Sequence, residues 1–155
     1  MKIKLFITFL IIFISLNSCG YKKMNVKNAE IFTLNNLYIT GEKNLNFIIK
    51  NKLMLYANNE SSSLLNIRIN LSKKKSVKEK KLNNKVNKYN ISLFFNASVV
   101  EENTGRKFNF NKTNTSDFVK EPTVIATKNN EDYKLRVMAE DTAEEFIDFL
   151  NINLE

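Results

Sequence analysis

Two stretches of the chain, residues 65–71 and 89–100, alternate between hydrophobic and polar positions. A period of two places every second side chain on the same face of a β-strand, so each stretch predicts a strand with one apolar and one polar face. In the first stretch, Asn66, Arg68 and Asn70 separate the apolar residues Leu65, Ile67, Ile69 and Leu71. A sheet built from such strands needs a cover on one face.

Apolar runs on either side of these stretches predict two more strands. Residues Glu30–Thr40 are rich in aliphatic, β-branched and aromatic side chains, and a glycine ends the run. Residues 102–105, Glu-Asn-Thr-Gly, have the composition of a hairpin turn in which the glycine adopts a positive φ. The return strand begins at Arg106 and places Phe108 and Phe110 on the face opposite Asn109 and Asn111.

Helical spacing replaces the alternation in two segments. Neither glycine nor proline interrupts Lys43–Ala57, where apolar residues recur with roughly helical spacing. Near the end of the chain, apolar or small positions follow the i, i+3, i+4, i+7 rule at Leu135, Met138, Ala139, Thr142, Ala143, Phe146, Phe149 and Leu150. Pro122 suits the first turn of this last helix, and Asn129-Asn130 is the point where we expect it to fray or restart.

The predicted element order is strand, helix, strand, strand, strand, helix. Because the central strands have one apolar face and two amphipathic helices are available to cover it, the chain predicts an α+β fold. We expect a two-layer sandwich with two helices packed on one face of a four-stranded, mostly antiparallel sheet. The other sheet face, lined by Asn, Ser and Arg, is expected to face water or a polar partner.

Residues 1–18 have the pattern of an export signal. Lys2 and Lys4 precede an uncharged apolar run, Leu5–Leu16, and small or polar residues follow it. As a helix this run spans about 18 Å, which is too short for a hydrocarbon core about 30 Å thick. The sequence therefore predicts a segment that is removed after export.

Leu16-Asn17-Ser18-Cys19 resembles a bacterial lipobox, in which the cysteine becomes the acylated N-terminus. Two or three acyl chains on Cys19 make a stable anchor, whereas one chain binds a membrane weakly. The resemblance implies a signal peptide at 1–18, a lipidated tether at 19–28 and a single domain at 29–155. Gly20 after the cysteine implies the outer membrane, with the domain on the periplasmic side. The alternative is an ordinary signal or membrane anchor in which Cys19 is incidental.

The charge balance restricts the partners and the chemistry. The chain has 24 Lys and Arg against 16 Asp and Glu, a formal charge of +8. In the cell envelope such a domain is expected to meet lipid phosphates, acidic glycolipids or an acidic protein surface rather than nucleic acid. With no histidine, one cysteine and no glycine-rich phosphate loop, the usual zinc, Ser-His-Asp and Cys-His sites are excluded. We expect no catalytic residues, no metal and no cofactor, and therefore no enzyme.

The chain resembles the lipopolysaccharide-assembly lipoproteins of Gram-negative bacteria, the LptE type. The resemblance rests on Cys19-Gly20-Tyr21, on the element order and on the spacing of Met138-Ala139-Glu140, Ala143, Phe146 and Leu150 in the last helix. It departs from the family at Lys22-Lys23-Met24, where a Pro-Leu-Tyr-like stretch often follows the aromatic residue. The resemblance implies a lipoprotein that plugs an LptD-type outer-membrane β-barrel, helps the barrel to assemble and binds lipopolysaccharide on its way to the outer leaflet.

Residues 73–88 contain eight lysines and one glutamate, and we interpret them as a loop after the second strand. Lysines meet lipid phosphates as point charges, whereas arginine binds them bidentately. Our hypothesis for lipopolysaccharide contact therefore names Lys73, Lys74, Lys75, Lys78, Lys80 and Lys81 in this loop, with Arg106 and Lys107 beside the hairpin turn. A solvated lysine loop without a ligand is the alternative. For the whole protein, the alternative is a structural or accessory outer-membrane lipoprotein of another envelope assembly complex.

Overall fold

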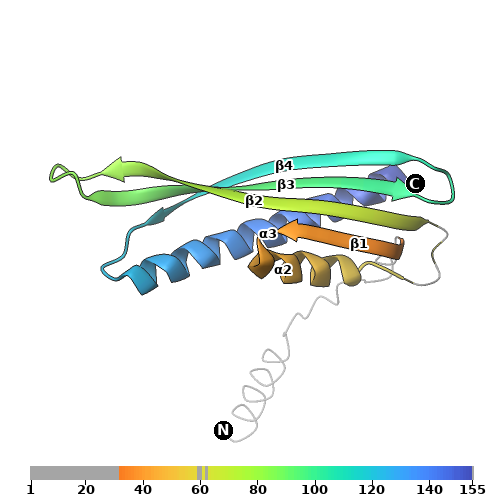
Figure 1. Ribbon diagram of the computed structural model, residues 1–155, viewed down its shortest axis with the longest axis horizontal. Helices are drawn as coiled ribbons and strands as arrows, with labels where there is room; N and C mark the ends of the chain where they lie inside the picture. The colour runs from red at the N-terminus through yellow and green to blue at the C-terminus, as the bar shows by residue number, and fades with distance from the viewer. Residues whose placement is uncertain (1–31, 59–60, 62, 155) are drawn as a thin grey trace, which may run out of the picture.

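The computed structural model describes residues 32–58, 61 and 63–154, which form two layers (Figure 1). The predicted signal peptide and the tether with Cys19 lie outside the described residues. The elements, in chain order, are β1 (Thr33–Gly41), α2 (Lys43–Met54), β2 (Leu64–Lys80), β3 (Val86–Glu101), β4 (Lys107–Val119) and α3 (Val124–Leu154).

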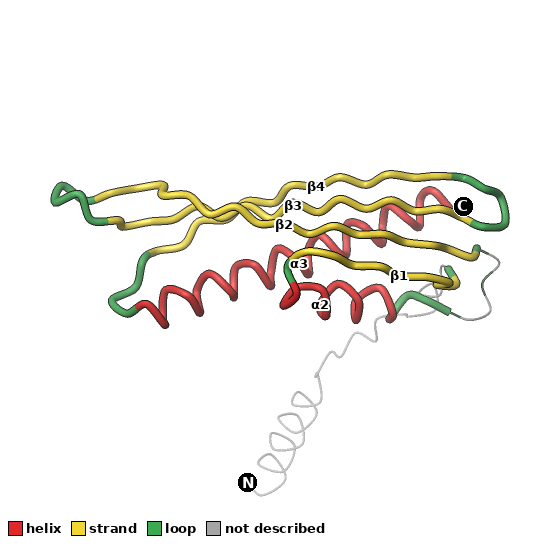
Figure 2. Tube along the Cα trace, in the orientation of Figure 1, coloured by secondary structure: helices red, strands yellow, loops and turns green. Residues whose placement is uncertain are grey.

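The four strands form one sheet in the order β1-β2-β3-β4. β1 pairs with β2 in parallel, whereas β2 with β3 and β3 with β4 form antiparallel hairpins. A tight turn cannot join parallel neighbours, and α2 therefore serves as the crossover between β1 and β2. Figure 2 shows both helices on the same side of the sheet. The predicted α+β class and element order are confirmed.

The core lies between this sheet face and the helices. One apolar row crosses all four strands through Ile39, Ile69, Ala97 and Phe110, as the register requires. The buried helix residues of the same core are Leu45, Ile49 and Leu53 of α2 and Leu135, Met138, Ala139, Ala143, Phe146, Ile147 and Leu150 of α3. Phe146 packs against the rings of Phe95 and Phe110, with centroids 5.4 and 5.3 Å away. The predicted apolar stripe of the last helix is thus core.

The polar face of the sheet also agrees with its pattern. Arg68, Asn70, Asn96 and Ser98 are exposed on the face away from the helices. This face carries the cross-strand row Asn70, Asn96 and Asn111 next to the row Arg68, Ser98 and Asn109. Helices cover one side of the sheet, and the described chain leaves hydrogen-bonding side chains on the other.

The end of α2 and the start of α3 differ from the predicted positions. α2 ends at Met54, because Ala57 instead forms a β-bridge with Phe32. α3 runs unbroken through Asn129-Asn130, where each asparagine costs at most about 0.7 kcal/mol of helix propensity. Pro122 precedes the helix, and the Thr123 hydroxyl accepts a hydrogen bond from the Ala126 amide at its start. Among the described residues, no helix combines the length and hydropathy that crossing a membrane requires.

Gly41 ends β1, and Gly105 lies in the hairpin turn between β3 and β4, so a substitution at Gly105 is a control for one at Gly41. Both have positive φ, at 99° and 70°, but a Cβ on Gly41 would lie 1.7 Å from the carbonyl oxygen of Leu71, whereas one on Gly105 would meet nothing within 4 Å. We expect Gly41→Ala to lower the free energy of unfolding by roughly 3 kcal/mol or more, and Gly105→Ala by about 1 kcal/mol. Urea unfolding followed by circular dichroism measures both. Equal losses would show that β1 does not approach β2 this closely.

Candidate binding surface at the basic hairpin

The lysine-rich segment forms a hairpin rather than a loop. β2 continues to Lys80 and pairs with β3 as far as Val86, so the predicted loop at Lys73–Lys81 is wrong for all positions but Lys81. The turn closes with the Lys81 amide bonded to the Lys85 carbonyl and with Asn84 at φ 61°, a conformation that asparagine tolerates. We call residues 73–88 the basic hairpin. It extends to the left end of the molecule in Figure 1.

Alternation along β2 divides the lysines between the two faces of the sheet. Leu71, Lys73 and Lys75 continue the helix-facing positions, and Lys73 and Lys75 pair across the sheet with Leu93 and Ile91. Lysine has a low strand propensity, so the sequence of this segment does not show the alternation of a strand. The segment is a strand because its residues pair with apolar positions of β3.

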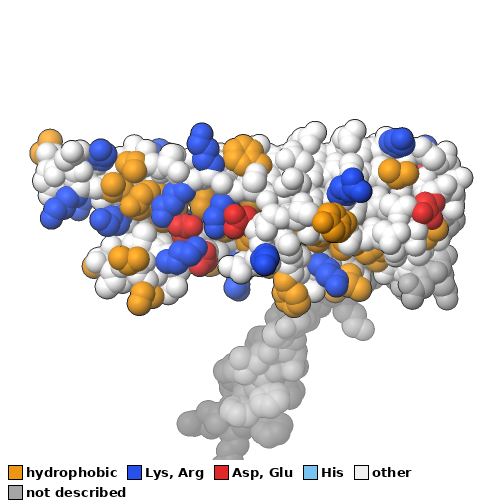
Figure 3. All heavy atoms as spheres, in the orientation of Figure 1, with side chains coloured by type: hydrophobic (Ala, Val, Ile, Leu, Met, Phe, Trp, Pro, Cys, Tyr) orange, Lys and Arg blue, Asp and Glu red, His pale blue; other side chains and the backbone are white. Residues whose placement is uncertain are grey.

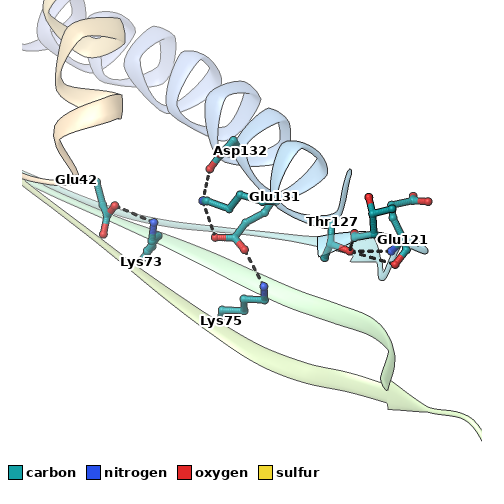
Figure 4. Close-up of polar contacts among 9 residues, drawn as sticks. Glu42, Lys73, Lys75, Glu121, Thr127, Glu131 and Asp132 are labelled. Carbon is teal, nitrogen blue, oxygen red and sulfur yellow. Dashed lines mark hydrogen bonds and ion pairs between the residues drawn. The ribbon is translucent and has the colours of Figure 1, made fainter. Parts of the chain in front are cut away.

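The two lysines that face the helices are ion-paired (Figure 4). The ammonium of Lys73 lies 2.9 Å from the Glu42 carboxylate, immediately before α2. Lys75 donates a hydrogen bond of 2.7 Å to Glu131 of α3, and its ammonium lies 4.2 Å from the centre of the Tyr89 ring. Such a contact between an ammonium and an aromatic face contributes roughly 0.5–1 kcal/mol. These two lysines hold the hairpin against the helices. Although 31% and 36% of their side-chain surface stays exposed, their charges are already neutralised by carboxylates of the chain.

Glu131 is the central residue of this contact, and the sequence analysis missed it. Its side chain is buried and also pairs with Lys128, one turn earlier in α3. Burial alone would raise the pKa of Glu131, but the hydrogen bond and charge of Lys75, together with Lys128, outweigh burial and lower the pKa below its ordinary value. The sequence did contain a sign of this role, because Glu131 lies four residues before Leu135 and therefore continues the apolar stripe of the last helix.

The outward-facing lysines differ from one another in their partners. Lys78 pairs with Asp117 of β4, whose pKa is lowered by a hydrogen bond from Asn90 and by Lys78 itself. The ammonium groups of Lys74, Lys80 and Lys81 have no hydrogen-bond or ion-pair partner within the part of the chain that the structure describes. Leu82, next to Lys81 in the turn, is fully exposed. Figure 3 shows blue side chains gathered at this end of the molecule.

Arg106 and Lys107 lie at the opposite end of the sheet. β3 joins the basic hairpin to their turn, and its length of 16 residues corresponds to about 50 Å. The Arg106 guanidinium donates a hydrogen bond of 2.8 Å to buried Glu101. That bond, followed by one from Thr104, lowers the pKa of Glu101. Arg106 therefore stabilises the turn, while Lys107 is exposed without a side-chain partner among the described residues.

The structure therefore does not bring the eight predicted basic residues into one site. Of these, Lys74, Lys80 and Lys81 are the lysines of the hairpin without a partner among the described residues. Two further cations near the hairpin were not predicted: Lys85 lies in the turn, and the amide of Lys120 donates a hydrogen bond to the Asn87 carbonyl. No group of three potential metal ligands is present in the described ranges. What the surface can do is attract a ligand with several negative charges, with Leu82 as an exposed apolar contact.

Solved structures of several lipoproteins have this architecture. Rare lipoprotein B from Shewanella oneidensis matches with a TM-score of 0.62 and 18% identity, over 79% of this chain and 98% of its own. A minor lipoprotein from Acinetobacter baumannii matches with a TM-score of 0.55 and 17% identity, over 79% of this chain and 94% of its own. The uncharacterized lipoprotein B from Nitrosomonas europaea gives 0.51 and 14%, over 77% and 83%. The chain shares its fold with these lipoproteins.

At these identities the likeness concerns the fold. It is consistent with the LptE-type fold that the sequence resemblance implies. No family model and no curated protein sequence matches the chain.

Glu131→Gln tests the contact between the basic hairpin and α3. Because the folded state lowers the pKa of Glu131, its contribution to stability is present above the unfolded pKa of about 4.3 and is lost as the pH falls through the folded pKa. We expect the variant to lose about 1–3 kcal/mol of unfolding free energy at pH 7 and to show a smaller further loss between pH 6 and pH 3. Urea titrations at several pH values measure both effects.

Glu145→Gln is the control, because it removes a surface ion pair with Lys112 from the same helix. We expect it to cost less than about 1 kcal/mol. If the two variants had the same stability and the same pH dependence, the buried contact would be energetically unimportant.

Proposed function

We propose that the protein is an outer-membrane lipoprotein that plugs an LptD-type β-barrel, assists its assembly and binds lipopolysaccharide during delivery to the outer leaflet. The observation that carries the proposal is the fold shared with rare lipoprotein B over nearly the whole length of that chain. The resemblance at Cys19-Gly20-Tyr21 supports the same assignment independently of the fold. In this proposal the protein acts by binding, without catalysis or a cofactor.

The polar face of the sheet supports insertion into a wet barrel. Its rows of Asn, Ser and Arg side chains can exchange hydrogen bonds with water or with a polar protein wall, and burying them without such partners would be costly. The network on this face is already ordered at one corner, where the Asn66 amide donates 2.7 Å to Glu102 and accepts from Asn36 at 2.8 Å. A barrel lumen is the polar surrounding that such a face fits.

The basic hairpin supports contact with lipopolysaccharide. Lipid phosphates require cations that are not already neutralised, and Lys74, Lys80 and Lys81 meet this requirement among the residues that the structure describes. The exposed side chain of Leu82 adds an apolar contact beside them. In this proposal Lys73, Lys75 and Arg106 keep the structural roles described above, and the ligand contacts the free lysines.

The first experiment identifies the partner. The lipidated protein is purified from detergent-solubilised envelopes, and the proteins that accompany it are identified by mass spectrometry. We expect a large outer-membrane β-barrel in stoichiometric amounts. A Cys19→Ala chain, which cannot be acylated, is the control, and we expect it to lose the partner. Recovery of the protein alone, or with a barrel-insertion complex, would contradict the plug and favour an accessory lipoprotein of another assembly.

The second experiment tests the lysines. Each cation near an anionic lipid surface contributes about 1 kcal/mol, so Lys80→Glu with Lys81→Glu is expected to weaken binding to immobilised lipopolysaccharide at least about tenfold. Lys107→Glu with Arg68→Glu changes the net charge equally, at the other end of the sheet, and is expected to have a much smaller effect. Surface plasmon resonance at two salt concentrations measures both. Equal losses would show that net charge decides binding, and no loss would remove the hairpin from the site.

A further inference from the structure

α2 presents an unusual stripe on the side away from the core. Its buried residues Leu45, Ile49 and Leu53 define the inner face. Opposite them, at spacings i, i+4, i+7 and i+11, cations alternate with large apolar side chains in the order Lys43, Phe47, Lys50 and Met54. We call these four residues the outer stripe of α2.

The apolar members of the outer stripe are open to solvent in the described chain. Phe47 is 69% exposed and Met54 55% exposed. Beside them lies a groove of about 340 Å³ whose other apolar lining is Leu34, Leu37 and Ile39 of β1. This surface therefore extends from the helix onto the edge strand, and burying it would be favourable by about 25 cal/mol for each Å² removed from water.

The charge of α2 points to an anionic partner. The helix contains no acidic residue, and the ammonium groups of Lys43 and Lys50 have no partner among the described residues. Lys52 belongs to a different side of the helix, where it pairs with Glu144 of α3. Leu55 lies on that side too, in a groove bordered by Glu140, Asp141 and Glu144 of α3. Phe47 stands between this groove and the one that it shares with β1.

The course of the chain places α2 near the predicted anchor. Phe32, the first described residue, forms a β-bridge with Ala57, just beyond the end of α2. Thirteen residue steps separate Phe32 from Cys19, a distance of at most about 45 Å when fully extended. A lipid on Cys19 would therefore hold this helix within about that distance of the membrane surface, and in Figure 1 α2 lies on the lower side of the molecule, below β1.

We propose that the outer stripe of α2 lies against a bilayer that contains anionic phospholipid, with Phe47 and Met54 among the acyl chains and Lys43 and Lys50 at the phosphates. This is the arrangement of an interfacial helix, in which apolar burial and attraction to anionic lipid act together. The contact orients the domain on the membrane. It rests on the lipid anchor of the proposed function and does not depend on the barrel or on lipopolysaccharide.

The test uses residues 19–155 with Cys19→Ser, so that no acyl chain contributes. This chain keeps every core residue, since the core lies between Phe32 and Leu150. A single cysteine carrying an environment-sensitive fluorophore is placed at exposed Asn51, next to the stripe, at Asn83 in the hairpin turn, or at Ser98 on the polar sheet face. Each protein is mixed with vesicles of phosphatidylcholine and phosphatidylglycerol in a 3:1 ratio, or of phosphatidylcholine alone, with and without a doxyl-lipid quencher.

We expect the fluorophore at position 51 to shift to the blue and to be quenched by doxyl lipid in the anionic vesicles, with no response at position 98. A response at position 83 in addition leaves this expectation intact. A response confined to position 83 would show that the hairpin meets the membrane instead of α2 and would overturn the proposal, as would no response at any position.

Stripe variants supply a second readout by vesicle sedimentation. Phe47→Ser with Met54→Ser is expected to reduce the bound fraction at least about tenfold, and Lys43→Gln with Lys50→Gln to reduce it similarly for anionic vesicles. Tyr38→Ser with Ile152→Ser removes two equally exposed apolar side chains elsewhere and is expected to change little. Equal effects of the stripe and control variants would overturn the proposal. Because neither barrel nor lipopolysaccharide is present, a missing barrel partner leaves this result unaffected.

Discussion

One-sided burial of the sheet is the constraint on which the rest of the structure depends. Every strand carries apolar side chains toward the helices, and the row from Ile39 to Phe110 crosses all four strands without a break. Both helices must therefore lie on the same side. α2 packs through its inner face and acts as the crossover between parallel strands, whereas α3 runs under the sheet as far as the hairpin. The opposite face keeps its asparagines and stays available for a polar surrounding.

The same geometry sorts the charges. A lysine on the helix-facing side of β2 is close to α2 or α3, where a carboxylate lies within reach of its ammonium group. Glu42 and Glu131 supply this charge for Lys73 and Lys75. Among the described lysines on the outer face and in the turn, Lys74, Lys80 and Lys81 have no such partner, whereas Lys78 pairs with Asp117 of β4. On β2 and its turn, the unpaired lysines are therefore those that do not face a helix.

These features give the domain surfaces of different chemistry. The polar sheet face fits a wet protein wall, the tip of the basic hairpin fits a multiply charged ligand, and the outer stripe of α2 fits an anionic bilayer. Because they belong to different elements, the three surfaces consist of different side chains. The proposed contacts with a bilayer, a barrel and a glycolipid therefore do not use the same residues.

The sequence by itself determined the fold class, because the alternation at Leu65–Leu71 and the helical spacing from Leu135 to Leu150 are local consequences of strand and helix geometry. It could not show that Lys73–Lys80 form a strand, because these residues have no apolar alternation and are extended by pairing with β3. Nor could it distinguish Lys75, which pairs with Glu131, from its unpaired neighbour Lys74. It also could not show that Arg106 lies about 50 Å from Lys80. Those properties depend on which face a residue occupies and on what packs against it, and contacts between distant segments decide both.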